Sequence, residues 1–171
     1  MEKKPVTHFT AGIIIGAIMI VYSLILNFTG LMANQALGFI SYLILFAGII
    51  YFVLQHAKST DNTATFGNLF SYGFKSTAIA TLILLVFQLI FFLVFPEYKE
   101  KIMEIARENM VKKGNLNEEQ INQGMEMMKR FFWIGIVGGT LFFMLLIGLI
   151  SSLIGAGIAK KSPNAPFQNP L

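Results

Sequence analysis

The chain has 171 residues and no cysteine; 55% of its residues are hydrophobic and only 13% are charged. Soluble domains carry about 25% charged residues, so this composition excludes an ordinary soluble protein. The absence of cysteine excludes a disulfide scaffold, a thiolate zinc site and a cysteine nucleophile. A net charge of +4, dispersed along the chain, also argues against a nucleic-acid-binding domain.

Three long segments, residues 5–57, 76–96 and 131–159, contain no charged side chain. About 20 residues of helix cross the hydrocarbon core of a bilayer, so these segments predict membrane spans. Lipid offers the backbone no hydrogen-bond partners, and each span must therefore be a continuous helix. We expect an all-α integral membrane protein with four spans.

The first charge-free segment is long enough for two spans separated by a polar turn. We place span one at about residues 9–28 and span two at about residues 37–54. Span one is longer than the apolar region of a signal peptide, and no small-residue cleavage site follows it. We therefore expect it to be retained as a membrane helix.

A polar connection precedes the third span. Within it, Phe66, Leu69, Phe70 and Phe74 recur at helical spacing, which predicts a short interfacial helix at about residues 65–74. Span three should follow at about residues 76–95, since Pro96 ends or kinks a helix.

Most of the charged residues lie in residues 97–130, where the pattern predicts two helices. Asn117 and Gln120 have the spacing of a capping box at the start of the second helix. We therefore expect an extramembrane helical hairpin between spans three and four. Its apolar stripe, a candidate interaction surface, includes Ile102, Ile105, Met110, Met125 and Met128. Methionine suits an adaptable contact, but the same stripe would also serve to pack the two hairpin helices together.

Span four is predicted at about residues 131–158, followed by a proline-containing tail at residues 162–171 that is typical of disorder. The whole chain, residues 1–171, is thus predicted to be a single membrane domain, a four-helix bundle with an extramembrane hairpin. Both termini are expected in the cytoplasm, because the first helix usually sets the orientation and the turn after it contains no Lys or Arg.

Small and polar residues inside the spans are candidates for helix packing. They are Gly12, Gly16, Gln88, Gly135, Gly139, Gly148 and Ser152. Small residues let helix backbones approach closely, and an amide in hydrocarbon needs a hydrogen-bond partner on another helix. We expect the small residues of span four to pack within the chain, and Gly12 and Gly16 to be open to a partner.

Catalytic motifs of the common hydrolase, metalloprotease and phosphate-binding types are absent from the sequence. His8 and His56 should lie near the same membrane face, where a metal or haem between them is conceivable. With no carboxylate or thiolate beside them, we interpret both as interfacial residues. We expect no catalytic residue, no metal and no cofactor.

Three stretches together resemble one family. They are residues 66–74 (FGNLFSYGF), the Pro96-Glu97-Tyr98 exit from span three with the loop at residues 114–121 (GNLNEEQI), and the Gly/Ser-rich end of span four closed by Lys160 and Lys161. Over nearly its whole length the chain is similar to the bacterial membrane proteins of domain-of-unknown-function family 4199 (DUF4199). The resemblance implies a small four-span protein of a bacterial inner membrane and implies no chemistry.

These features favour a non-enzymatic structural or interaction subunit. Its partners would be the lipid bilayer and either another membrane protein or further copies of the chain, with no nucleic acid. The alternative is a small oligomeric transporter or channel, in which Thr77, Thr81 and Gln88 line a path along one face of span three. Transporters usually keep an ionisable group within the bilayer, and the spans lack one. An enzyme is the third hypothesis.

Overall fold

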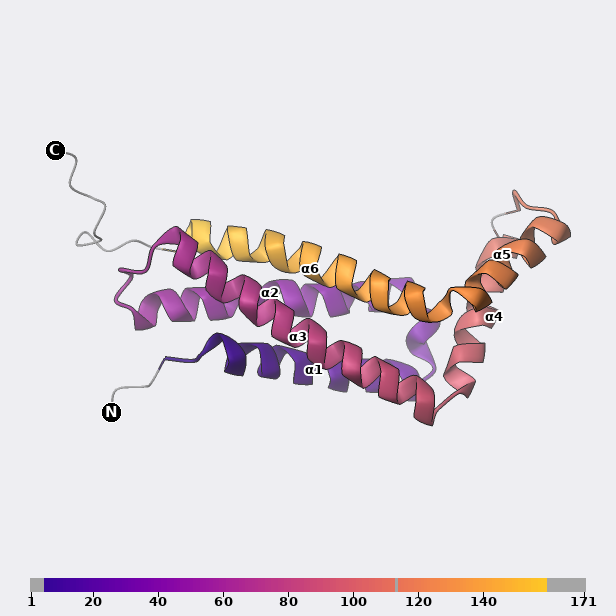
Figure 1. Cartoon of the computed structure of the whole chain (residues 1–171), viewed down its shortest axis with the longest axis horizontal. Coiled ribbons are helices and arrows are strands. Elements are labelled where there is room, and N and C mark those ends of the chain that lie inside the picture. Colours follow the sequence, from indigo (N-terminus) through magenta and orange to yellow (C-terminus); the bar gives the residue numbers. More distant parts are fainter. Residues whose placement is uncertain (1–4, 113, 160–171) are drawn as a thin grey trace. The chain divides into compact units, whose positions relative to one another are not determined.

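The computed structural model describes residues 5–112 and 114–159. Within these ranges the regular structure is entirely helical. The helices are α1 (His8–Phe28), the short 3-10 helix η1 (Leu31–Ala33), α2 (Gln35–Ser59), α3 (Phe66–Val94), α4 (Glu97–Lys112), α5 (Glu118–Arg130) and α6 (Phe132–Ile158) (Figure 1). The predicted all-α fold is confirmed. The tail expected at residues 162–171 lies outside the described residues.

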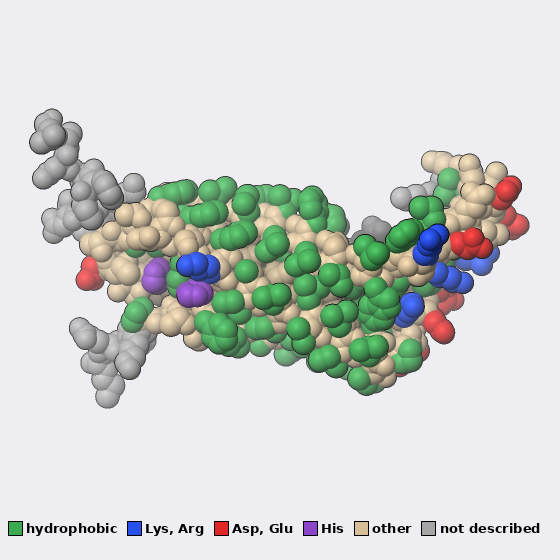
Figure 2. All heavy atoms as spheres, in the orientation of Figure 1, with side chains coloured by type: hydrophobic (Ala, Val, Ile, Leu, Met, Phe, Trp, Pro, Cys, Tyr) green, Lys and Arg blue, Asp and Glu red, His purple; other side chains and the backbone are tan. Residues whose placement is uncertain are grey.

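Four helices, α1, α2, α3 and α6, are long and apolar enough to cross a membrane. Large hydrophobic side chains point outward from them: Leu82, Leu93 and Phe142 are 59%, 72% and 63% exposed. Figure 2 shows hydrophobic side chains spread over the visible face of these helices, whereas most Lys, Arg, Asp and Glu side chains gather on α4 and α5. Lipid is the solvent that suits such apolar helix faces. The chain is a multi-pass membrane protein.

The described residues divide into two compact units. The first consists of residues up to Leu84 together with those from Phe142 onward, and it contains α1, α2 and parts of α3 and α6. The second, Leu85–Leu141, contains α4, α5 and the remaining parts of α3 and α6. Helices α3 and α6 therefore each contribute residues to both units.

Local sequence sets the limits of α2. The chain reverses after α1 at Gly30, whose φ of 73° lies in the left-handed region that glycine adopts without strain. Asn34 then caps α2, because its side-chain oxygen accepts hydrogen bonds from the backbone N–H groups two and three residues later. At the other end, Asp61 and Asn62 have positive φ values of 51° and 58°, which asparagine and aspartate tolerate and which stop the helix.

Helix α3 is one continuous helix where the sequence predicted two. The segment expected to be a separate interfacial helix forms its first turns. Gly73 lies inside this continuous helix. Its lack of a side chain allows other helices to approach closely. A Cβ on Gly73 would stand 2.6 Å from the Ser152 hydroxyl oxygen and 2.8 Å from a methyl group of Val53. Helix α2 likewise continues to Ser59, beyond the predicted end of span two at about residue 54.

Glycines bring α1 against α3. A Cβ on Gly12 would stand 2.7 Å from both the Ile79 Cβ and the Ser76 carbonyl oxygen, and a Cβ on Gly16 would stand 3.2 Å from the Ile83 Cγ2. The same chain therefore fills the two notches that we expected to be open to a partner. Lipid supplies no hydrophobic force between helices, so this close backbone approach is a main source of their attraction.

We predict that Gly12→Ala destabilises the protein by about 1 to 3 kcal/mol, because the added methyl group meets backbone that cannot move aside. Gly38→Ala in α2 is the matched control, since a Cβ there meets nothing within 4 Å. It should be neutral or stabilise the protein by up to about 1 kcal/mol through helix propensity. Unfolding by sodium dodecyl sulfate in mixed micelles measures both changes. Equal stability of the two variants would contradict the α1–α3 packing.

Candidate functional site

The pair of helices α4 and α5 is built by strong local signals. Gly114 has a φ of 66°, and Asn117 caps α5. Both halves of a capping box are present: the Asn117 side chain accepts from the Gln120 N–H at 2.9 Å, and the Gln120 side chain accepts from the Asn117 N–H at 3.0 Å. The hairpin predicted at residues 97–130 corresponds to these two helices, which pack against each other.

The five residues of the predicted interaction surface, Ile102, Ile105, Met110, Met125 and Met128, are all half-buried. The Met110 methyl group lies close to Gly124, 3.4 Å from where a Cβ would stand, so part of the stripe packs α4 on α5. The residues buried most deeply between the helices are Met103 and Ile121. Met103 was not among the residues predicted for this stripe, although its spacing of seven residues from Met110 places both on one face of α4.

A mixed-charge cavity of about 860 Å³ lies beside α4 and α5. We call it the charged cavity; it is lined by Pro96, Lys99, Glu100, Met103, Glu104, Arg107, Met125 and Lys129. It thus combines acidic and basic groups with two methionine side chains, both of which are flexible and polarisable. The cavity therefore offers charges of both signs and two adaptable apolar side chains to a molecule that fits it.

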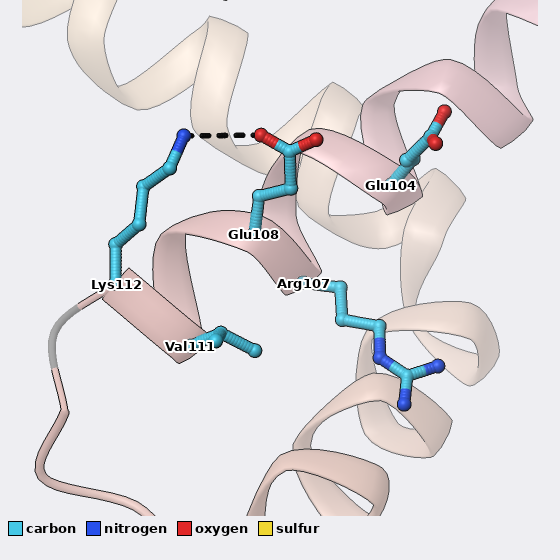
Figure 3. Close-up of a pocket in the computed structure, with 5 residues that line it drawn as sticks. All are labelled: Glu104, Arg107, Glu108, Val111 and Lys112. Atoms are coloured by element: carbon cyan, nitrogen blue, oxygen red, sulfur yellow. Dashed lines mark hydrogen bonds and ion pairs between the residues drawn. The ribbon is translucent and has the colours of Figure 1, made fainter.

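A second depression, of about 340 Å³, follows the exposed side of α4. Its residues Glu104, Arg107, Glu108, Val111 and Lys112 are drawn in Figure 3. The Lys112 ammonium lies 3.1 Å from the Glu108 carboxylate, and Arg107 extends away from that pair. Because both paired side chains are more than half exposed, the ion pair contributes little to stability.

An apolar groove of about 540 Å³ occupies the junction of α5 and α6. It is lined by Ile102, Gly124, Met127, Met128, Phe131, Phe132, Gly135 and Ile136. Cations lie over two of its aromatic rings. The Arg130 guanidinium is 5.6 Å from the centre of the Phe131 ring, and the Lys99 ammonium is 5.0 Å from that of Phe132.

Polar groups inside the spans are used for packing. Thr77 and Thr81 donate to carbonyl oxygens of their own helix at 3.1 and 2.8 Å, and both are buried. Thr77 also fills the space over Gly148, where a Cβ would overlap its side chain. Thr77 and Thr81 therefore lie where α3 packs tightly within the chain. These contacts do not support the transport path along α3 that the transporter hypothesis requires.

Gln88 finds the interhelical partner expected of an amide in hydrocarbon. Its side-chain oxygen accepts a hydrogen bond of 3.0 Å from the Thr140 hydroxyl on α6. Ser152 lies against Gly73, and its hydroxyl has no partner among the described residues. Gly135 and Gly139, which we expected to pack within the chain, are open: a Cβ added at either would have nothing within 4 Å.

The two histidines meet around a tyrosine. The His56 ring stacks on the Tyr72 ring with centres 4.1 Å apart, and the His8 ring approaches it edge-on at 6.4 Å. The Tyr72 hydroxyl donates to the Val6 carbonyl oxygen at 2.9 Å. In the described part of the chain no three His, Cys, Asp or Glu side chains form a metal-binding group. The contact therefore joins the ends of α1, α2 and α3 through a tyrosine ring.

A family model described as "Protein of unknown function (DUF4199)" matches residues 10–161, which is most of the chain. Neither the curated proteins nor the solved structures contain a significant match. The family description assigns no activity.

We predict that Gln88 and Thr140 are energetically coupled. Gln88→Leu and Thr140→Val should each destabilise the protein, and the double variant should lose less than the sum of the two. The coupling free energy should be about 0.6 to 1.7 kcal/mol, the range for hydrogen bonds between membrane helices. A double-mutant cycle of unfolding in mixed micelles measures it. Strict additivity would show that the hydrogen bond has no energetic role.

Proposed function

We propose that this chain, which belongs to the DUF4199 family, is a non-enzymatic structural or interaction subunit of a bacterial inner membrane. Its extramembrane hairpin, α4 and α5, is the part that binds a partner. The partner is a protein whose charges complement those of the charged cavity.

The proposal rests on one observation: the charged residues are concentrated in the hairpin, and few of them form ion pairs. Seven of the nine acidic residues lie in residues 97–130, together with seven basic residues. Among the described residues, the ion pair formed is the exposed one between Glu108 and Lys112. Glu100, Glu104 and Arg107 line the charged cavity without such a pair. Charges of both signs around an apolar floor favour recognition of a protein with a complementary pattern.

Two further observations favour binding over chemistry or transport. The charged cavity contains carboxylates and cations but no histidine or serine, so it lacks the usual nucleophile with an adjacent base. The threonine hydroxyls proposed to line a transport path donate to their own helix. These two hydrogen bonds support a packing role for the threonines over a role in lining a transport path.

The test exchanges the charges of the cavity. In wild-type protein expressed at its native level, purification in mild detergent should recover a stoichiometric partner. The double variant Glu104→Lys, Arg107→Glu should lower recovery about tenfold or more, since one misplaced charge contact costs at least that factor. Glu126→Lys is the control, because Glu126 is an exposed residue of α5 that does not line the cavity.

Two results would contradict the proposal. They are the absence of any stoichiometric partner, and equal recovery with the cavity variant and the control. Unfolding measurements on both variants confirm that folded proteins are being compared, so that a loss of recovery reports a binding defect.

We also propose that both termini lie in the cytoplasm, which places the hairpin on the outer side of the membrane. Asn115 lies in the exposed loop between α4 and α5, and the chain has no native cysteine. In intact spheroplasts, a membrane-impermeant maleimide should therefore label Asn115→Cys. Labelling that appears only after the membrane is broken would reverse the orientation.

A further inference from the structure

The apolar groove at the junction of α5 and α6 has the size and lining of a ligand site. Its volume of about 540 Å³ falls within the range of about 300 to 1,000 Å³ that is common for small-molecule sites. Every residue that lines it is apolar or glycine. The groove remains open at Gly135, where an added Cβ would have no atom within 4 Å.

The groove lies where the chain passes from water into lipid. Most of its residues come from the second half of the charged helix α5 and from the start of the membrane span α6, and Ile102 comes from α4. Trp133, an aromatic residue typical of the bilayer interface, stands beside Phe132 in that first turn, with ring centres 5.5 Å apart. A molecule in this groove would therefore sit at the depth of lipid headgroups and upper acyl chains.

Two cations lie over aromatic rings of the groove. The Arg130 guanidinium lies over the Phe131 ring and the Lys99 ammonium over the Phe132 ring, and both rings line the groove. No lining residue is acidic. Arginine presents several N–H donors in a fork that matches phosphate oxygens, and lysine adds a point charge.

We propose that this groove binds an anionic phospholipid from the surrounding bilayer. One acyl chain lies along Met127, Phe131 and Gly135, and the phosphate is held by Arg130 and Lys99. The proposed lipid site shares Lys99 with the charged cavity, but it uses the apolar groove and leaves the carboxylates of the cavity free for the partner proposed above.

Charge also disfavours a second copy of the chain as the occupant. A two-fold symmetric dimer formed through the groove would bring Arg130 and Lys99 of both copies into one interface. Such like charges oppose association where few counterions reach. An anionic lipid neutralises them and is already present at this depth.

The first test uses the purified full-length protein in an uncharged detergent. Dioleoylphosphatidylglycerol and dioleoylphosphatidylcholine are titrated separately, and bound lipid is counted by native mass spectrometry. Both lipids carry a phosphate, but phosphatidylcholine also carries a choline ammonium, which Arg130 and Lys99 repel. The anionic lipid should therefore bind about tenfold more tightly, the equivalent of about 1.4 kcal/mol. Inorganic phosphate alone should not bind, since it has no chain to fill the groove.

Substitutions then locate the site. Gly135→Leu should fill the groove and weaken binding of the anionic lipid about tenfold, the equivalent of about two methylene contacts. Gly157→Leu in the same helix is the control, because a Cβ at Gly157 also meets nothing within 4 Å but Gly157 does not line the groove. Arg130→Gln should remove the preference for the anionic lipid, whereas the exposed Lys75→Gln should leave it unchanged.

The proposal is overturned if the two lipids bind equally, if inorganic phosphate binds as well as the lipid, or if Gly135→Leu and Gly157→Leu behave alike. It is also overturned if Gly135→Leu abolishes dimerisation or protein capture without changing lipid binding, since the occupant would then be a protein. Unfolding of each variant in mixed micelles, expected to match the wild type, confirms that the folded protein is being compared. Because the charged-cavity variants are not used, failure of this test leaves the proposed partner binding untouched.

Discussion

The structure depends on one constraint: hydrocarbon cannot hydrogen-bond to the peptide backbone or solvate a charge. Within the spans this constraint requires continuous helices, and the described spans are continuous over 21 to 29 residues. It also directs polar side chains inward to their own helix. Thr77, Thr81 and Ser76 are buried, and each donates to a carbonyl oxygen four residues earlier. Apart from Lys58 in the last turn of α2 and Lys75 in the first half of α3, the ionised groups of the described residues lie outside the spans, most of them in α4 and α5.

The same constraint removes the hydrophobic force that would hold helices together in water, so close approach of backbones takes its place. Glycines provide that approach at defined points. Gly12 meets the backbone of α3, Gly148 makes room for Thr77, and Gly73 makes room for Ser152. A methyl group at any of these positions would have to displace a neighbour. Polar groups add direction to this packing, as the hydrogen bond between Gln88 and Thr140 does for α3 and α6.

Much of the fold could be predicted from sequence because lipid acts on each segment separately. A run without charge is a local property, and the four spans follow from it; the capping box at Asn117 is equally local and marks the start of α5. Packing partners are not local. Spacing alone showed that Gly12 and Gly135 were small residues on helix faces, but not that the first is filled by α3 and the second is open. For the same reason the stacking of Tyr72 with His56, two residues far apart in the chain, could not be predicted from the sequence.

The difference between filled and open glycines bears on function. A filled notch serves the fold, since its neighbour within the chain gains the contact. An open glycine lowers the stability of its helix by about 1 kcal/mol relative to alanine, and no neighbouring helix of the chain gains a contact from it. Gly135 is open, it lines an apolar groove, and two cations held over aromatic rings stand beside that groove. The two cations contact rings of this chain, and Gly135 differs from open glycines such as Gly38 and Gly157 in lining a groove beside them. The anionic lipid proposed above would use both features, because its chain would fill the groove and its phosphate would neutralise the cations.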